Sequence, residues 1–142
     1  MKVTHFNCPR GIGKTTWCKR KIDMSLNNKY VVYVGHTKHV ADRFWQRLRA
    51  ISDPETLFLN RESDLTTMQP FKLRCLPMNK VRSVAYTEED QPDLIIFDDP
   101  YIDTITEADR EEVEVILEEA KKWIKPEGDL IIIYTDLDDQ HK

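Results

Sequence analysis

An eight-residue segment near the N-terminus, CPRGIGKT at 8–15, lies between a predicted strand and a predicted helix. The strand covers Lys2–Asn7, and the helix covers Gly13–Leu26, with Asn27 and Asn28 ending it. Glycines at such a junction let the backbone turn tightly and direct N–H groups at an anion. The sequence therefore predicts a phosphate-binding loop. The alternative is a glycine turn that only caps a helix.

Each residue type in this loop suits phosphate chemistry. Gly11 and Gly13 allow close backbone approach, Lys14 supplies a charge for the β- and γ-phosphates, and the Thr15 hydroxyl can ligate Mg²⁺. The Walker A pattern has a glycine where Cys8 stands. We expect Lys14 to be solvated when no nucleotide is bound. The expected nucleotide-binding residues are Pro9, Arg10, Gly11, Ile12, Gly13, Lys14, Thr15 and Thr16.

A second signal is the segment DLIIFDDP at 93–100, in which an apolar strand ends in two carboxylates. In a parallel sheet, Asp98 and Asp99 would lie at the carboxyl edge, beside the phosphate loop. Asp98 suits a Walker B role, holding the Mg²⁺ through water, and Asp99 suits a base or a residue that positions water. The alternative is an Asp pair that forms a turn and a helix cap. The phosphate loop earlier in the chain favours the metal site.

Apolar strands alternate with amphipathic helices along the chain, which predicts a three-layer α/β fold with helices on both faces of a mostly parallel sheet. The whole chain, 1–142, is expected to form one domain. Two short strands are predicted at Phe71–Leu76 and Val81–Tyr86, and a turn at Pro77–Lys80 could join them as a hairpin. The other expected elements are strands at Tyr30–Val34, Asp93–Phe97 and Leu130–Tyr134 and helices at Lys38–Ile51 and after Thr106, where Asp109 completes a capping box.

Charge is divided unevenly along the chain. Residues 1–49 carry 11 Lys and Arg against 2 Asp and Glu, whereas residues 87–142 carry 5 against 19. The basic third could contact DNA, or the two regions could simply neutralise each other in the fold. No apolar run is long enough for a membrane span, and the three cysteines form no CxxC pair. We expect a cytoplasmic protein, in the host cytoplasm if the source is viral.

These motifs resemble the ATPase domain of phage large terminase subunits, the genome-packaging motors, and more distantly helicase-like ATPases. In terminases the loop often lacks its first glycine and carries an arginine three residues before Gly-Lys-Thr, as Arg10 does relative to Gly13. Several also have Asp-Asp-Pro at the Walker B position, as at Asp98–Pro100. The resemblance implies a RecA/ASCE-like P-loop fold. It also implies Mg²⁺-dependent ATP hydrolysis coupled to nucleic acid, in viral DNA packaging or DNA processing.

The resemblance further implies a role for individual residues. Lys14, Arg10 and Asp99 would be catalytic, Thr15 and Asp98 would hold Mg²⁺, and Thr135 would sense the γ-phosphate. Asp99 stands where most such ATPases have Glu. A homo-oligomeric ring is the natural expectation for a motor. The chain is short beside a complete motor, so we expect a minimal ATPase, an accessory protein or an isolated domain.

Two other functions stay open at this point. One is a small nucleotide or nucleoside kinase, which would share the phosphate loop and the parallel sheet. Such kinases usually close an arginine-rich lid over the phosphates, and no arginine cluster follows Arg82. The other is a nucleotide-binding module without catalysis, which Cys8 and the short Asp99 side chain would permit.

Overall fold

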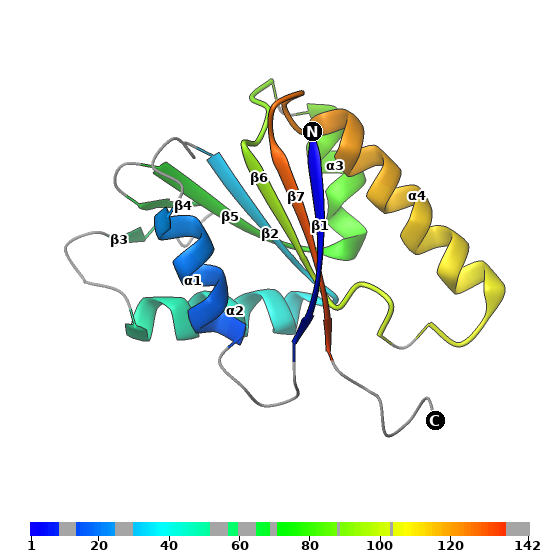
Figure 1. Ribbon diagram of the computed structural model, residues 1–142, viewed down its shortest axis with the longest axis horizontal. Helices are drawn as coiled ribbons and strands as arrows, with labels where there is room; N and C mark the ends of the chain where they lie inside the picture. The colour runs from blue at the N-terminus through cyan, green and yellow to red at the C-terminus, as the bar shows by residue number, and fades with distance from the viewer. Residues whose placement is uncertain are drawn as a thin grey trace.

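The structure is a computed structural model that describes residues 1–8, 14–24, 30–51, 57–59, 65–68, 71–87, 89–102 and 104–135 (Figure 1). Its elements are β1 (Lys2–Cys8), α1 (Lys14–Met24), β2 (Tyr30–Gly35), α2 (Lys38–Ile51), β3 (Leu57–Leu59), β4 (Leu65–Met68), β5 (Phe71–Pro77), the 3₁₀ turn η2 (Met78–Lys80), α3 (Val81–Thr87), β6 (Leu94–Asp98), α4 (Glu107–Trp123) and β7 (Asp129–Thr135).

The strands form one sheet in the order β1-β7-β6-β2-β5-β4-β3. The first five in this order are all parallel, and β4 and β3 extend the sheet as antiparallel strands beyond β5. Parallel strands covered on both faces are apolar along their whole length, and β2 and β6 are buried at every position. The prediction of an α/β fold with a mostly parallel sheet is therefore confirmed.

Alternate side chains of the strands β2, β5, β6 and β7 enter two separate cores. In β2, Val31 and Tyr33 pack toward α1 and α2, whereas Val32 and Val34 pack toward α3 and α4. Figure 1 shows the same division, with α1 and α2 on one face and α3 and α4 on the other. The period of two along a strand thus produces the three predicted layers.

One expected element is wrong. Residues 81–86 were predicted as the second strand of a hairpin, but they lie in the helix α3, after the turn η2. The apolar residues Val81, Val84 and Ala85 recur at helical spacing and pack into the core on the α4 side. Because β5 and β6 both run parallel to β2, the chain between them must cross over, and a helix is the usual crossover.

The helix α4 begins as the sequence predicts. The Thr106 hydroxyl accepts from the Asp109 N–H at 3.1 Å, and the Asp109 carboxylate accepts from the Thr106 N–H at 3.1 Å. These two hydrogen bonds form a capping box. The apolar side chains along one side of this helix are buried, together with its C-cap residue: Val113, Ile116, Leu117, Ala120, Trp123 and Ile124.

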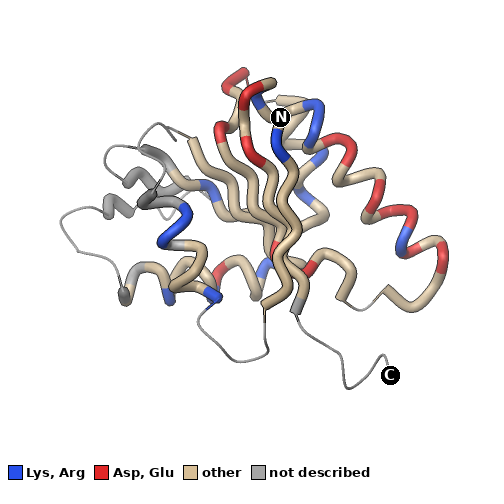
Figure 2. The backbone as a smooth tube through the Cα atoms, in the orientation of Figure 1, with Lys and Arg blue, Asp and Glu red and all other residues tan. Residues whose placement is uncertain are grey.

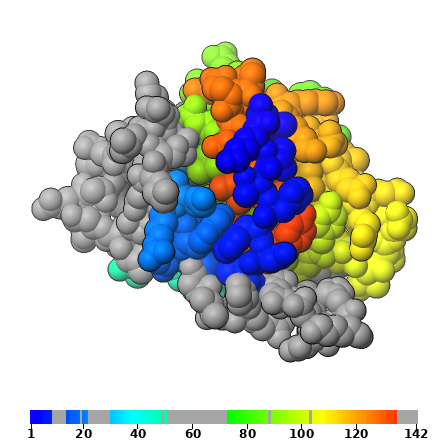
Figure 3. All heavy atoms as spheres, viewed as in Figure 1, coloured from blue at the N-terminus to red at the C-terminus, as the bar shows by residue number. Residues whose placement is uncertain are grey.

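Charge follows the two faces of the sheet. Figure 2 shows Asp and Glu along most of α4, whereas Lys and Arg predominate on α1 and α2. The strand β1 is an edge of the sheet and lies at the molecular surface (Figure 3). In the described part of the chain, no helix has the length and apolar character needed to cross a membrane.

Candidate functional site

The carboxyl ends of the parallel strands meet at one edge of the sheet. In the strand register, Cys8 at the end of β1 pairs with Thr135 of β7, and Asp98 at the end of β6 pairs with Ile133 of β7. The strand β7 therefore lies between the strand before the glycine-rich segment and the strand that carries the acidic pair. Ligands of open α/β sheets bind at this edge.

Lys14 and Asp98 meet at this edge. The Lys14 ammonium lies 2.7 Å from Asp98 Oδ1, and the Asp98 side chain is only 3% exposed. Lys14 is the first residue of α1, so the positive end of that helix lies beside the same carboxylate. The expectation that Lys14 is simply solvated is thus wrong: a third of its side chain is exposed, but its charge is paired.

The second oxygen of Asp98 accepts a hydrogen bond from a residue that the sequence patterns did not single out. The Tyr33 hydroxyl donates a hydrogen bond to Asp98 Oδ2, and Tyr33 is 1% exposed. Burial raises the pKa of Tyr33 well above its ordinary value, and the Asp98 carboxylate raises it further, so the hydroxyl stays a donor. The available signal was a tyrosine within an otherwise apolar buried strand, because a buried hydroxyl needs a partner.

Asp99 has a different backbone from its neighbour. Its φ is 54°, in the left-handed region, and its N–H donates to the Ile133 carbonyl at 2.8 Å. Asp and Asn are enriched in this region among non-glycine residues. The turn therefore directs the half-buried Asp99 away from the strand path of Asp98. This backbone conformation suits the short Asp side chain at this position.

Two cysteine thiols line the same region. Cys8 and Cys18 are buried, and burial raises the pKa of each thiol, with the Asp98 carboxylate also acting in that direction. Both sulfurs are therefore protonated at neutral pH and pack as small apolar groups. Cys8, which stands at the first glycine position of the Walker A pattern, is the last residue of β1 and packs in the core on the α1 side.

The remaining predicted site residues divide into two groups. Thr15 is half-buried and Thr16 exposed in the first turn of α1, and the Thr135 main chain continues β7 beside Cys8. The predicted residues that lie outside the described part of the chain are Pro9, Arg10, Gly11, Ile12 and Gly13.

The donor atoms present fit a magnesium ion only in part. Among the described residues, no group of three or more His, Cys, Asp or Glu is placed to hold a metal. Mg²⁺, however, is usually bound through one or two carboxylates together with substrate phosphates and water. Asp98 Oδ1 suits that kind of site, and Thr15 follows Lys14 in the first turn of α1.

Comparison with known proteins identifies the fold. No family model matches the chain, and no curated protein matches its sequence. Among solved structures, the crystal structure of the N-terminal domain of the DNA packaging ATPase from bacteriophage phi29 superposes with a TM-score of 0.61. The chain shares this fold. The match covers 94% of this chain and 72% of that one at 13% identity. At so low an identity, the match demonstrates a common fold and does not extend to the chemistry of the site.

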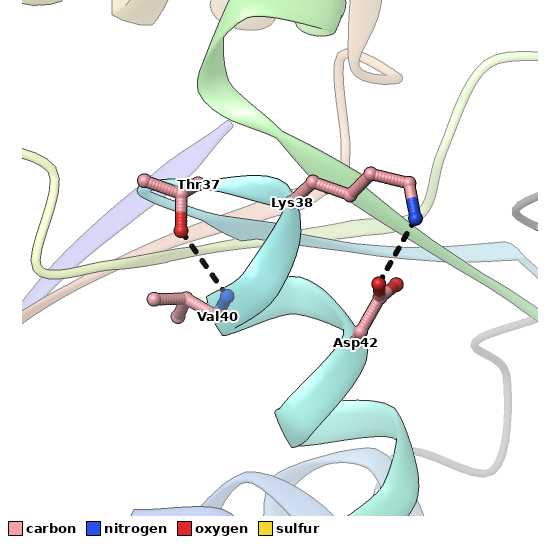
Figure 4. Close-up of polar contacts among 4 residues, drawn as sticks. All are labelled: Thr37, Lys38, Val40 and Asp42. Carbon is pink, nitrogen blue, oxygen red and sulfur yellow. Dashed lines mark hydrogen bonds and ion pairs between the residues drawn. The ribbon is translucent and has the colours of Figure 1, made fainter.

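A cavity of about 370 Å³ lies farther along the same edge. Its apolar wall is formed by Met78, Val113 and Ile116, so it lies on the α3 and α4 face. Its rim includes Thr37 and Lys38, at the start of α2 (Figure 4). The Tyr33–Asp98 contact, in contrast, belongs to the α1 and α2 face. Sequence patterns did not predict this cavity, because its walls come from three separate parts of the chain.

Figure 4 shows how the polar side chains at the start of α2 are engaged. Thr37 Oγ1 accepts from the Val40 N–H at 3.2 Å, and Lys38 Nζ lies 3.0 Å from Asp42 Oδ2. The first hydrogen bond caps the helix, and the second is a surface pair one turn apart. Both contacts stabilise α2 locally. The Thr37 hydroxyl and the Lys38 ammonium are therefore already engaged and are not free to bind a ligand in the cavity.

Proposed function

We propose that this chain is a P-loop ATPase that hydrolyses ATP at a Mg²⁺ site formed by Lys14, Thr15 and Asp98. The observation that carries the proposal is the 2.7 Å contact between Lys14 Nζ and Asp98 Oδ1. These two residues stand 84 positions apart in the sequence, and each belongs to a separate candidate nucleotide-binding motif. The fold shared with a phage DNA packaging ATPase domain supports the same reading.

Phosphate binding follows from the start of α1. The helix places its N-terminal N–H groups and the positive end of its dipole at the carboxyl edge of the sheet. Lys14 neutralises Asp98 in the structure, and the same ammonium serves the β- and γ-phosphates of a bound nucleotide. Pro9–Gly13 and Thr16 complete the proposed nucleotide-binding set, with Thr135 beside the γ-phosphate.

The metal would be held by oxygen atoms. The Asp98 carboxylate and the Thr15 hydroxyl are the donors proposed for Mg²⁺, which prefers oxygen ligands. A Mg²⁺ ion supplies charge that offsets the negative charge developing on the phosphates. Asp99, turned away from the strand by its left-handed backbone, is proposed to orient the attacking water, and Arg10 to stabilise charge on the transferred phosphoryl group.

Coupling to nucleic acid is proposed for the basic face. Arg20 and Lys21 are exposed on α1, and Lys21 lies over the Trp17 ring at 5.4 Å. Exposed cations on one helix can track phosphates. The solved structure is by its description a domain of a DNA packaging ATPase, so we propose DNA as the nucleic acid. We also propose a homo-oligomer as the working assembly, as the resemblance to packaging motors implies.

The test measures two reactions in parallel. We expect the purified chain to release phosphate from ATP with Mg²⁺, to do so faster with DNA, and to lose this activity in Asp98→Asn. Lys121→Ala, a change in a surface pair on α4, is the control and should keep full activity. Transfer of the γ-phosphate to nucleosides without phosphate release would make the chain a kinase. Nucleotide binding with neither reaction would make it a binding module.

A further inference from the structure

The two oxygens of Asp98 have different partners. Oδ1 lies beside the ammonium of Lys14, whose side chain is one-third exposed, whereas Oδ2 accepts from the buried Tyr33 hydroxyl. The first partner, Lys14, is the first residue of α1 and has a long, rotatable side chain. The second sits in the middle of the sheet. A ligand that attracts Lys14 therefore uncovers Oδ1 and leaves Oδ2 engaged.

The Tyr33 ring is held in place by its surroundings. It stacks on Phe44 of α2, with ring centroids 3.6 Å apart and an angle of 5° between planes. Its strand β2 is paired on both sides, with β6 and with β5. The hydroxyl therefore has one position, and the Asp98 carboxylate that accepts from it has one orientation.

This orientation limits how the carboxylate can bind a cation. A carboxylate with both oxygens free can chelate an ion through both, which the large Ca²⁺ ion accepts readily. A carboxylate with one oxygen already hydrogen-bonded offers the other alone. Mg²⁺ requires near-octahedral geometry with short bonds, and a single oxygen per carboxylate satisfies it.

We propose that Tyr33 is a positioning residue that restricts Asp98 to one metal-binding oxygen and so favours Mg²⁺ over Ca²⁺. The proposal rests on the proposed function, in which Asp98 holds the metal of a metal–nucleotide complex. Tyr33 touches neither nucleotide nor metal and acts through Asp98. Hydrogen-bond partners of metal ligands orient those ligands, and their loss typically lowers metal affinity by about 10- to 100-fold.

The experiment measures binding without turnover. The affinity for a fluorescent ATP analogue is titrated with excess Mg²⁺, with excess Ca²⁺ and with a chelator, in the wild-type chain and in Tyr33→Phe. Tyr30→Phe is the matched control, because Tyr30 is a buried tyrosine of the same strand that faces the other core. Phe44→Leu is a second variant, which keeps the Tyr33 hydroxyl and removes the ring that holds it.

We expect Tyr33→Phe to lower the affinity with Mg²⁺ by about 10-fold and the affinity with Ca²⁺ by less than about twofold. Phe44→Leu should change the ratio of the two affinities in the same direction by a smaller factor, and Tyr30→Phe should leave it unchanged. An unchanged ratio in folded Tyr33→Phe, or in Phe44→Leu if the first variant does not fold, overturns the proposal. If Mg²⁺ gives the wild-type chain no advantage over the chelator, the proposed metal site itself fails.

Discussion

The Lys14 ammonium lies 2.7 Å from Asp98 Oδ1. This ion pair joins the first residue of α1 to the last residue of β6, which stands 84 positions later in the sequence. Asp98 is the only charged residue that is buried among the side chains that the structure describes. Its neighbours therefore decide both the stability of this edge and the chemistry proposed for it.

Replacing Lys14 by Met should destabilise the fold as well as abolish hydrolysis, because the Asp98 carboxylate would remain buried without its counter-charge. We expect a loss of about 2 kcal/mol in the free energy of unfolding, below the roughly 3–5 kcal/mol of a fully buried pair, since Lys14 is 33% exposed. Adding Asp98→Asn should restore at least half of the loss. Urea unfolding of the wild type and of the two variants measures these losses.

The control for these unfolding measurements is Lys38→Met, which breaks the exposed pair with Asp42 on α2. It should cost less than about 0.5 kcal/mol, as exposed pairs one helical turn apart usually do. Equal losses for Lys14→Met and Lys38→Met would mean that the Lys14–Asp98 contact is an ordinary surface pair.

The two neighbouring aspartates should respond differently to the same change. Asp98→Asn should weaken Mg²⁺-dependent nucleotide binding and turnover together. Asp99→Asn should keep binding near wild type and lower turnover by about 100-fold, the size expected for a positioned base. Asn also accepts the left-handed backbone at 99, so this variant should fold normally. Nucleotide affinity and single-turnover hydrolysis separate the two, and identical behaviour of both variants would refute the division of roles.

Any DNA binding should depend on salt through the Lys and Arg residues of α1. Replacing Lys19, Arg20 and Lys21 by Gln should flatten the dependence of affinity on salt concentration, because fewer counterions are released. Lys121→Gln with Lys122→Gln, which removes charge from the acidic helix α4, is the control and should leave the slope unchanged. Binding isotherms at several salt concentrations decide this. A triple variant that binds DNA as the wild type does would make the charge division a packing feature.

The capping box of α4 should contribute to stability in a pH-dependent way. Thr106→Ala should cost about 1 kcal/mol at neutral pH. Hydrogen bonds from Thr106, by its N–H and its side chain, and from the Ile105 N–H lower the pKa of Asp109 below 3.8. A carboxyl whose pKa is lower in the folded state stabilises the fold above its unfolded pKa, and this contribution is lost as the pH falls through the folded pKa.

The measurement for Asp109 is the difference in unfolding free energy between the wild type and Asp109→Ala. This difference should be constant from pH 7 to about pH 5 and should shrink below 3.8. Glu107→Ala, which removes another acid from the same helical turn, is the control. A gap that stays the same down to pH 2 would show that Asp109 acts through something other than its hydrogen-bonded carboxylate.

Local patterns in the sequence determined much of this fold. The apolar runs of β2 and β6, the stripe along α4 and the Thr106–Asp109 cap each depend on neighbours a few residues apart, and all were predictable. The same is true of Lys14 and Asp98 as candidates, because each belongs to a short motif next to a strand. The pattern at 81–86 was misread because six residues are too few to separate helical from strand spacing.

Tertiary structure decided the contacts between distant segments. Only the sheet order places β7 between β1 and β6, and only the packed core brings the Tyr33 hydroxyl to Asp98. The left-handed backbone of Asp99 likewise arises where the end of β6 hydrogen-bonds to β7. The physical reason is that burial and hydrogen bonding of one residue depend on atoms contributed by strands far away in the sequence, and spacing along the chain carries no information about those atoms.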